Sequence, residues 1–190
     1  RICYITRKED GTSFTAYHNN GSFGVCSRNL ELKNEAFPGT DVNVYWKIAR
    51  QYNIEEKLKD YYENTERNIA VQGEIVGDGI NHNRLGLPRN THQLHLFSIY
   101  DIHEHKYLDY EEFILVASIL EIPTVKTIFF GTFNFDLKQL LEMAKGKHEG
   151  TKNNIEGIVV RPVNETFSET LQGRLSFKVI NDEYLLKEEE

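Results

Sequence analysis

The chain has 190 residues and a formal net charge of −7, from 29 acidic and 22 basic side chains. Hydrophobic residues make up 39% of it and aromatic residues 12%, which suits one folded domain with a real core and excludes a disordered chain. The net acidity argues against a protein that binds nucleic acid through overall positive charge, although it allows a local basic groove. No apolar run in the sequence is long enough to span a membrane.

The cysteines and the start of the chain bear on the cellular compartment of the protein and on whether the chain is part of a longer one. Cys3 and Cys26 have neither metal-ligand spacing nor a disulfide pattern, so we expect reduced thiols in an intracellular protein, in the cytoplasm or the nucleus. The sequence starts at Arg1 inside a strand-like run, without a signal peptide. We therefore expect it to be part of a longer protein.

Strand-like and helix-like segments follow one another irregularly. The letters NNG between two alternating runs predict a hairpin, and apolar residues at helical spacing predict a helix that Thr40 or Asp41 can cap. Strict alternation predicts that Phe97 and Ile99 share one face of a strand and that Tyr100 lies on the other. In chain order we expect strands at 2–6 and 12–28, a helix at 38–66 with a second piece at 54–62, strands at 68–80 and 93–102, a helix at 109–120, an extended segment at 128–133 and a helix at 136–147. Strands follow at 155–163 and 174–186, and the second of these can run into a helix. Many strands without regular βαβ alternation predict an α+β fold with mainly antiparallel sheets.

Charged residues interrupt three apolar strand-like stretches. Glu74, Glu156 and Lys178 each stand where a charge costs several kcal/mol unless it is paired or used. One such residue alone is usually at a sheet edge or extends its charge into solvent. Three of them, together with Lys8 beside Asp10, favour convergence on one anionic ligand that carries a metal.

The order of short motifs resembles a known superfamily. Lys8-Glu9-Asp10-Gly11 resembles the KxDG signature of covalent nucleotidyltransferases, the ATP-dependent ligases and mRNA capping enzymes. The later motifs follow in the order of that superfamily: SRNLEL at 27–32, QGEIVGDGINHNRLGL at 72–87, FSIYD at 97–101, EGIVVRP at 156–162 and SFKVIN at 176–181. The segment around Glu74 most resembles the RNA-nick-sealing ligases of the Deinococcus type, in which an OB domain precedes the catalytic domain.

The resemblance implies a fold and a function. It implies an ATP-grasp-like nucleotidyltransferase domain over residues 1–190, with antiparallel sheets flanked by helices, the nucleotide between the sheets, and an N-terminal OB domain outside this chain. The implied activity is that of an ATP-dependent RNA ligase in RNA repair, which forms lysyl-AMP, transfers AMP to an RNA 5′-phosphate and seals that end to a 3′-OH. The implied cofactors are ATP and Mg²⁺ or Mn²⁺, and the implied partner of the monomer is a nicked duplex with an RNA 3′-OH strand. A DNA ligase, a GTP-dependent capping guanylyltransferase and a non-catalytic RNA-binding module remain alternatives.

The resemblance also implies roles for the matching residues. Lys8 is the nucleophile, and Lys178 contacts the α-phosphate and stabilises its charge. Asp10 and Glu156 serve the metal. A free lysine is protonated at pH 7, and neighbouring carboxylates favour that form, so Asp10 is expected to hold metal-bound water near the nucleophile rather than activate it directly. The nucleotide-binding positions are Arg7, Arg28, Glu74 on the ribose, Tyr100 stacked on adenine with Phe97 as its substitute, and Lys178.

Some positions depart from the family pattern or stand outside it. Arg7 replaces a common glutamate, which leaves its part in adenine recognition open. Ile180 replaces a second lysine, for which Lys187 is a candidate substitute. Glu9 occupies a variable position and is expected to be solvated. The segment 145–152 is expected to be a solvated loop that can touch RNA phosphates.

Overall fold

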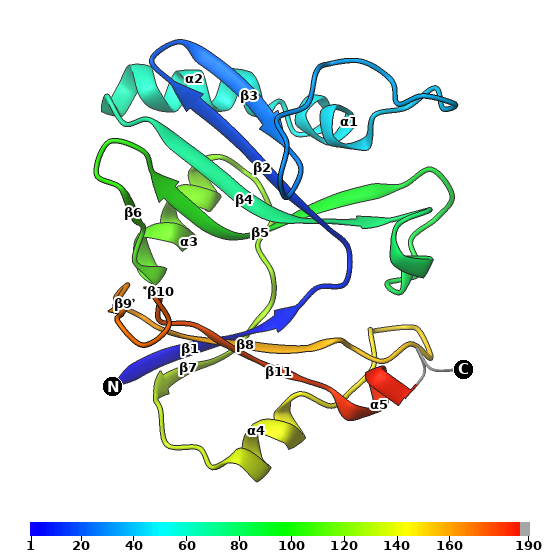
Figure 1. The fold of residues 1–190 in the computed structure, drawn as a ribbon, viewed down its shortest axis with the longest axis vertical. Helices are drawn as coiled ribbons and strands as arrows, with labels where there is room; N and C mark the ends of the chain where they lie inside the picture. The colour runs from blue at the N-terminus through cyan, green and yellow to red at the C-terminus, as the bar shows by residue number, and fades with distance from the viewer. Residues whose placement is uncertain (187–190) are drawn as a thin grey trace.

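Two antiparallel sheets lie one above the other in the computed structural model, which describes residues 1–186 (Figure 1). The larger sheet consists of β2 (Thr12–Asn19), β3 (Ser22–Cys26), β4 (Ile69–Gly77), β5 (His92–Asp101) and β6 (Lys106–Tyr107), in the order β3-β2-β4-β5-β6. The smaller sheet consists of β1 (Ile2–Lys8), β7 (Thr127–Thr132), β8 (Gly157–Pro162) and β11 (Phe177–Ile180), in the order β11-β8-β1-β7. A short ribbon of β9 (Phe167–Ser168) and β10 (Gly173–Arg174) stands beside them. The predicted α+β fold with mainly antiparallel sheets is confirmed.

Helices α1 (Val44–Gln51), α2 (Ile54–Thr65) and α3 (Tyr110–Ile119) cover the outer face of the larger sheet, and α4 (Leu137–Met143) covers that of the smaller sheet. The 3₁₀ turn η1 (Asn81–Asn83) follows β4, and α5 (Asp182–Leu186) follows β11. In Figure 1, α1 and α2 lie over the larger sheet and α4 lies under the smaller one. Within residues 1–186 there is no helix with the length and apolarity that crossing a membrane requires.

Two hydrophobic cores hold these layers together. The first lies between the larger sheet and α1 to α3, where Phe14, Leu58 and Leu96 are fully buried. The second lies between the smaller sheet and α4, and it includes Ile5 and Leu140. Because neighbouring residues of a strand point to opposite faces, burial of Ile5 on the α4 side turns the alternate residues of β1 toward the larger sheet. The space between the sheets is therefore lined by polar as well as apolar side chains.

The first helix begins later than the sequence predicted. Neither Thr40 nor Asp41 caps it; the side chain of Asn43 accepts hydrogen bonds from the backbone N–H groups of Tyr45 (3.1 Å) and Trp46 (3.3 Å). An asparagine in this position satisfies two amides that the first turn leaves unpaired. The helix ends before Asn53, whose φ of 51° separates α1 from α2.

The predicted alternation of β5 is wrong after Leu96. Gly73 of β4 pairs with Leu96 and the next residue, Gln72, pairs with Ser98, so Phe97 is an extra residue in the ladder. Such a β-bulge redirects a side chain and reverses the alternation beyond it. Leu96 and Ile99 both enter the first core, whereas the sequence placed them on opposite faces.

The last predicted strand, at 174–186, divides into two short strands, and it runs into a helix as the sequence allowed. Gly173 and Arg174 pair with β9, residues 177–180 join the edge of the smaller sheet, and α5 follows. Lys178 therefore lies on β11, an edge strand of the smaller sheet that pairs with β8.

Candidate active site

The chain crosses from the smaller sheet to the larger sheet immediately after Lys8 (Figure 1). The Nζ atom of Lys8 lies 2.6 Å from Oε1 of Glu156, which directly precedes β8. Gly157 pairs with Lys8 in the ladder, and a Cβ atom on Gly157 would lie 2.1 Å from the carbonyl oxygen of Val179. A glycine is therefore required for β8 and β11 to come together at the point where Glu156 meets the lysine.

The turn that follows the lysine rests on β4. The backbone N–H of Gly11 donates a hydrogen bond of 3.2 Å to Oε1 of Glu74. A Cβ atom on Gly11 would lie 2.1 Å from the carbonyl oxygen of Ile75, so no other residue fits without a backbone shift. The glycine of the KxDG motif thus brings the turn that follows Lys8 onto the larger sheet.

Glu74 is held in an environment that disfavours its charge. Burial raises the pKa of Glu74 from 4.5 to about 7, and the nearby charges of Glu156 and Asp10 act in the same direction. The charge of Lys8 and the hydrogen bond from Gly11 oppose this rise. The same interactions place all four charged groups close together around the turn.

Asp10 is 8% exposed and bonded at both carboxylate oxygens. Its Oδ1 atom accepts from Nδ2 of Asn81 at 3.0 Å. Its Oδ2 atom accepts from the hydroxyl of Tyr184 at 2.8 Å and lies 3.1 Å from Nε of Arg84. The carboxylate is therefore fixed in orientation by a loop of the larger sheet and by α5.

A pocket between the two sheets opens beside Lys8. Residues from both sheets line it, including Arg7, Lys8 and Glu9 from the end of β1, Glu74 from β4, Phe97 from β5, and Val159 and Arg161 from β8. Nη1 of Arg161 donates to the backbone oxygen of Phe97 at 3.2 Å, which holds the bulge of β5 against β8. Phe97 and Val159 give the pocket apolar walls from opposite sheets, suited to a flat ring, beside charged groups at its mouth.

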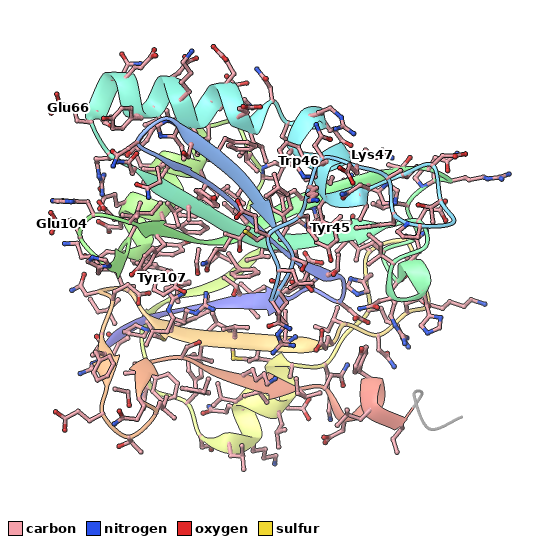
Figure 2. The ribbon with its side chains drawn as sticks, turned by 45° about the horizontal axis from the view of Figure 1, so that its top comes forward. Tyr45, Trp46, Lys47, Glu66, Glu104 and Tyr107 are labelled. Atoms are coloured by element: carbon pink, nitrogen blue, oxygen red, sulfur yellow. The ribbon has the colours of Figure 1, made fainter. Side chains whose placement is uncertain are left out.

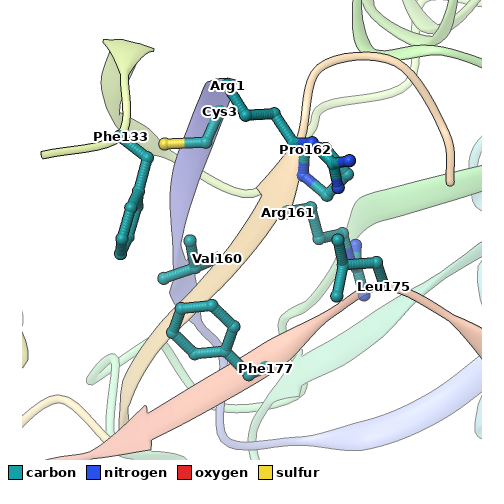
Figure 3. A pocket seen from close by; sticks show the side chains of 8 residues that line it. All are labelled: Arg1, Cys3, Phe133, Val160, Arg161, Pro162, Leu175 and Phe177. Carbon is teal, nitrogen blue, oxygen red and sulfur yellow. The ribbon is translucent and has the colours of Figure 1, made fainter. Parts of the chain in front are cut away.

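A second pocket lies elsewhere on the smaller sheet (Figure 3). It is lined by Cys3, Val160 and Phe177, which alternate along their strands with the residues that face the larger sheet. It contains neither Lys8 nor any of the predicted carboxylates.

The sequence matches a family model described as RNA ligase over residues 1–180. This chain belongs to the RNA ligase family. No match was found among curated proteins. The motif-based prediction of an RNA ligase is confirmed at the level of the family.

Solved structures of RNA ligases have the same fold. They include the Naegleria gruberi RNA ligase with PPi, at 31% sequence identity and a TM-score of 0.83, where the match covers 100% of this chain and 52% of that chain. A variant of the same ligase with ATP and Mn matches at 30% identity and a TM-score of 0.83, again over 100% and 52%. A further variant with AMP and Mn matches at 31% identity and a TM-score of 0.82, over 98% and 52%. The predicted nucleotidyltransferase fold is confirmed, and the chain spans about half the length of these relatives.

The structure brings most of the predicted site residues together. Lys8, Glu74 and Phe97 line one pocket, with Glu156 and Asp10 next to its mouth. Lys178 pairs with Val159, a pocket residue, so it lies on the pocket face of the smaller sheet. Ile180 pairs with Gly157 and faces the same side, and the proposed substitute Lys187 lies outside the described residues.

Two predicted nucleotide-binding residues lie away from this pocket. Tyr100 is past the bulge and packs edge-on against Tyr107, with ring centroids 5.1 Å apart. Figure 2 shows Tyr107 to the left of Tyr45, whose hydroxyl bonds that of Thr12 just after the turn that follows Lys8. Arg28 is exposed in the bend after β3 and does not line the pocket. Phe97, the substitute, lines the pocket, whereas Tyr100 lies farther along the strand beside Tyr107.

Sequence reasoning missed several residues at the site. Glu9 is not solvated: its side chain is 11% exposed and Oε1 lies 3.1 Å from Nδ1 of His95. His148, in the loop predicted to be solvated, is buried, and burial lowers its pKa. Asn81 and Arg84 stand inside the motif at 72–87, so their positions carried a signal. Glu9 and His148 carried none, because their partners are distant in sequence.

The carboxylates present suit a hard divalent cation only in part. Within residues 1–186 no three His, Cys, Asp or Glu side chains are grouped closely enough to hold a metal. Asp10 and Glu156 offer oxygen donors, and Mg²⁺ typically binds through one or two carboxylates while keeping waters and substrate phosphates as its other ligands. The residues therefore fit a cation that arrives with a phosphate.

The raised pKa of Glu74 predicts a pH dependence of stability. A carboxyl group with a higher pKa in the folded state binds its proton more tightly there, so it contributes stability at low pH that is lost as pH rises from 4.5 to about 7. Glu74→Gln keeps an oxygen for the Gly11 amide and removes the charge. Relative to wild type, the variant should gain about 3 kcal/mol of unfolding free energy between pH 4 and pH 8, since each pKa unit corresponds to about 1.4 kcal/mol.

Urea denaturation of the ligand-free protein at both pH values measures this difference. Glu63→Gln, at an exposed position of α2, is the matched control and should follow wild type. A Glu74→Gln variant whose stability relative to wild type is the same at pH 4 and pH 8 would contradict the pKa assignment.

Proposed function

We propose that this chain is the nucleotidyltransferase domain of an ATP-dependent RNA ligase, and that Lys8 is the residue that becomes adenylylated. The observation that carries the proposal is the Lys8 amine at the mouth of the pocket, 2.6 Å from Glu156, in a chain of the RNA ligase family. Structures of the Naegleria ligase include forms with ATP, with AMP and with PPi, which are the substrate, the nucleotide that is transferred and the leaving group of such a step.

The proposed reaction has a simple balance. Nζ of Lys8 bonds to the α-phosphorus of ATP, the bond from that phosphorus to the bridging oxygen breaks, and pyrophosphate leaves with the electron pair. The amine gives up a proton on the way, because an ammonium group has no free electron pair. Later, an RNA 5′-phosphate oxygen displaces the lysine, and a 3′-OH then displaces AMP.

The other residues of the pocket support this chemistry by position. Lys178, on the pocket face of β11, contacts the α-phosphate and offsets its growing charge. Glu74 binds the ribose hydroxyls, and Phe97 packs on adenine against Val159. Mg²⁺ or Mn²⁺ bound beside Glu156 and Asp10 would supply positive charge that favours the neutral amine and stabilises the phosphate.

The proposal includes four finer features. The motif around Glu74 favours nick sealing of the Deinococcus type, with RNA at the 3′-OH side. The solved relatives are about twice as long as this chain, which is consistent with an additional domain such as the OB domain. A monomer that acts inside the cell, in the cytoplasm or the nucleus, completes the proposal.

Replacing the nucleophile should abolish the covalent adduct. Lys8→Ala should take up no AMP from ATP and Mn²⁺, because the variant has no amine at the pocket mouth. Intact-protein mass spectrometry measures the adduct, and added pyrophosphate should remove it from wild type. Lys145→Ala, which changes an exposed lysine paired with Glu142, is the control and should be adenylylated like wild type.

The same experiment separates the alternative functions. Labelling of wild type from GTP instead of ATP would indicate a capping guanylyltransferase. No labelling from either nucleotide would favour an RNA-binding module. Labelling of Lys8→Ala would mean that another residue is the nucleophile.

The lining of the pocket predicts which aromatic residue contacts the base. Phe97→Ala should raise the KM for ATP in the adenylylation step by roughly tenfold, because base stacking contributes on the order of 1–3 kcal/mol. Tyr100→Ala is the matched variant, three residues along the same strand but outside the pocket, and its KM should be unchanged. An increase for Tyr100→Ala alone would restore the original assignment.

The proposed RNA specificity predicts a preference at the 3′-OH side of a nick. Two duplexes should be compared that differ only in the 3′-OH strand, one RNA and one DNA, since the 2′-OH is what distinguishes them. We expect faster sealing of the RNA strand, measured by gel analysis of single-turnover reactions. Equal rates would favour a DNA ligase or a ligase without sugar selectivity, and Lys8→Ala provides the blank.

A further inference from the structure

Three consecutive residues after β4 have left-handed backbone conformations. The φ angles are 42° at Asn81, 64° at His82 and 46° at Asn83. Non-glycine residues avoid this region, and strained backbone persists only where the surrounding structure determines it. The side chain of Asn83 closes the loop through bonds to Leu87, as donor to its oxygen (2.8 Å) and acceptor from its N–H (3.0 Å). The loop is therefore built to hold one particular shape.

The shape places an amide group on the nucleophile turn. The Nδ2 group of Asn81 donates to Oδ1 of Asp10 at 3.0 Å and to the backbone oxygen of Gly11 at 2.7 Å. Both hydrogens of the amide are thus used on two successive residues of the KxDG motif. Arg84, at the end of the same loop, brings Nε to 3.1 Å from the other carboxylate oxygen of Asp10.

The third contact to Asp10 comes from the other end of the chain. Tyr184 of α5 is buried and donates its hydroxyl to Oδ2 of Asp10 at 2.8 Å. Its ring packs beneath the guanidinium of Arg84, whose Cζ atom is 5.0 Å from the ring centroid. Three elements far apart in sequence therefore meet at one carboxylate.

We infer that Asn81, Arg84 and Tyr184 are positioning residues, which fix the orientation of the Asp10 carboxylate so that it can hold a cation-bound water. A carboxylate oxygen has two lone pairs, so each oxygen can accept a further hydrogen bond besides the one that orients it. Among the described residues, Oδ2 accepts a hydrogen bond from Tyr184 and pairs electrostatically with Arg84, and Oδ1 accepts a hydrogen bond from Asn81. This inference rests on the proposed function, because it assumes that Asp10 serves the metal.

Asn81 and His82 provide a matched pair of variants. Both residues have positive φ, which glycine adopts without cost, so Asn81→Gly and His82→Gly change the backbone preference alike. Asn81→Gly removes the amide that holds Asp10. His82→Gly removes an exposed imidazole and leaves the contacts to Asp10 in place. A difference between the two variants therefore reports the amide and not the strain of the loop.

The first measurement is the Mn²⁺ concentration that gives half-maximal adenylylation at saturating ATP. Partners that orient a metal-binding group typically change affinity 10- to 100-fold, so we expect Asn81→Gly to raise this concentration at least tenfold and His82→Gly to leave it unchanged. Tyr184→Phe, which loses one bond to Oδ2, should give a smaller rise. Thermal melting of all variants checks that each is folded at the assay temperature.

The second measurement does not depend on turnover. In the Lys8→Ala background with ATP, free Mn²⁺ is measured by electron paramagnetic resonance, and adding Asn81→Gly should weaken Mn²⁺ binding whereas adding His82→Gly should not. Equal binding by the two double variants overturns the inference even if wild type is adenylylated normally. If wild type takes no AMP, the proposed function fails, and the Mn²⁺ comparison alone decides whether Asn81 positions Asp10.

Discussion

The close approach of the turn after Lys8, at residues 9–11, to β4 is the constraint on which the site depends. The chain leaves the smaller sheet at Lys8 and enters the larger sheet at Thr12, with Gly11 pressed against the carbonyl of Ile75. Any side chain at Gly11 would push the sheets apart at this point. The distance between Lys8 and the residues of the larger sheet, including Glu74, is therefore set by a backbone contact. A backbone contact is stiffer than any pair of charged side chains, which suits a site that must hold reacting atoms within about 1 Å.

Around this contact the protein concentrates charge that it does not fully neutralise. Glu74 is buried at a cost that shows in its raised pKa, and Asp10 is buried with donors on both oxygens. Burial of a charge is tolerated where it is paired or used. The two carboxylates therefore differ: Asp10 is fixed in orientation by Asn81, Arg84 and Tyr184, while the pKa of Glu74, raised to about 7, lets it exchange a proton near neutral pH. A site that binds an anionic nucleotide together with cations benefits from both.

Local sequence patterns predicted the elements well and their edges less well. The hairpin at β2 and β3, the strand at β4 and the helices α2 and α3 follow from alternation and helical spacing. The predicted start of α1 was wrong, because the two caps considered, Thr40 and Asp41, lie before Asn43, which accepts the hydrogen bonds of the first turn. The bulge at Phe97 could not be read from β5 alone, because it depends on the register with Gly73 of the neighbouring strand. Pairing with a distant strand thus decided which residues of β5 after Leu96 enter the core.

The sequence by itself determined the family and the candidate site residues. Six ordered motifs point to Lys8, Asp10, Glu74, Glu156 and Lys178, because the proposed chemistry requires those residue types wherever the fold places them. The tertiary structure alone decided how these groups are held. The contacts of Asp10 with Asn81 and Tyr184, and of Glu9 with His95, join segments separated by 71, 174 and 86 positions. Such contacts leave no local periodicity, because they form only when two sheets and a terminal helix pack around one turn.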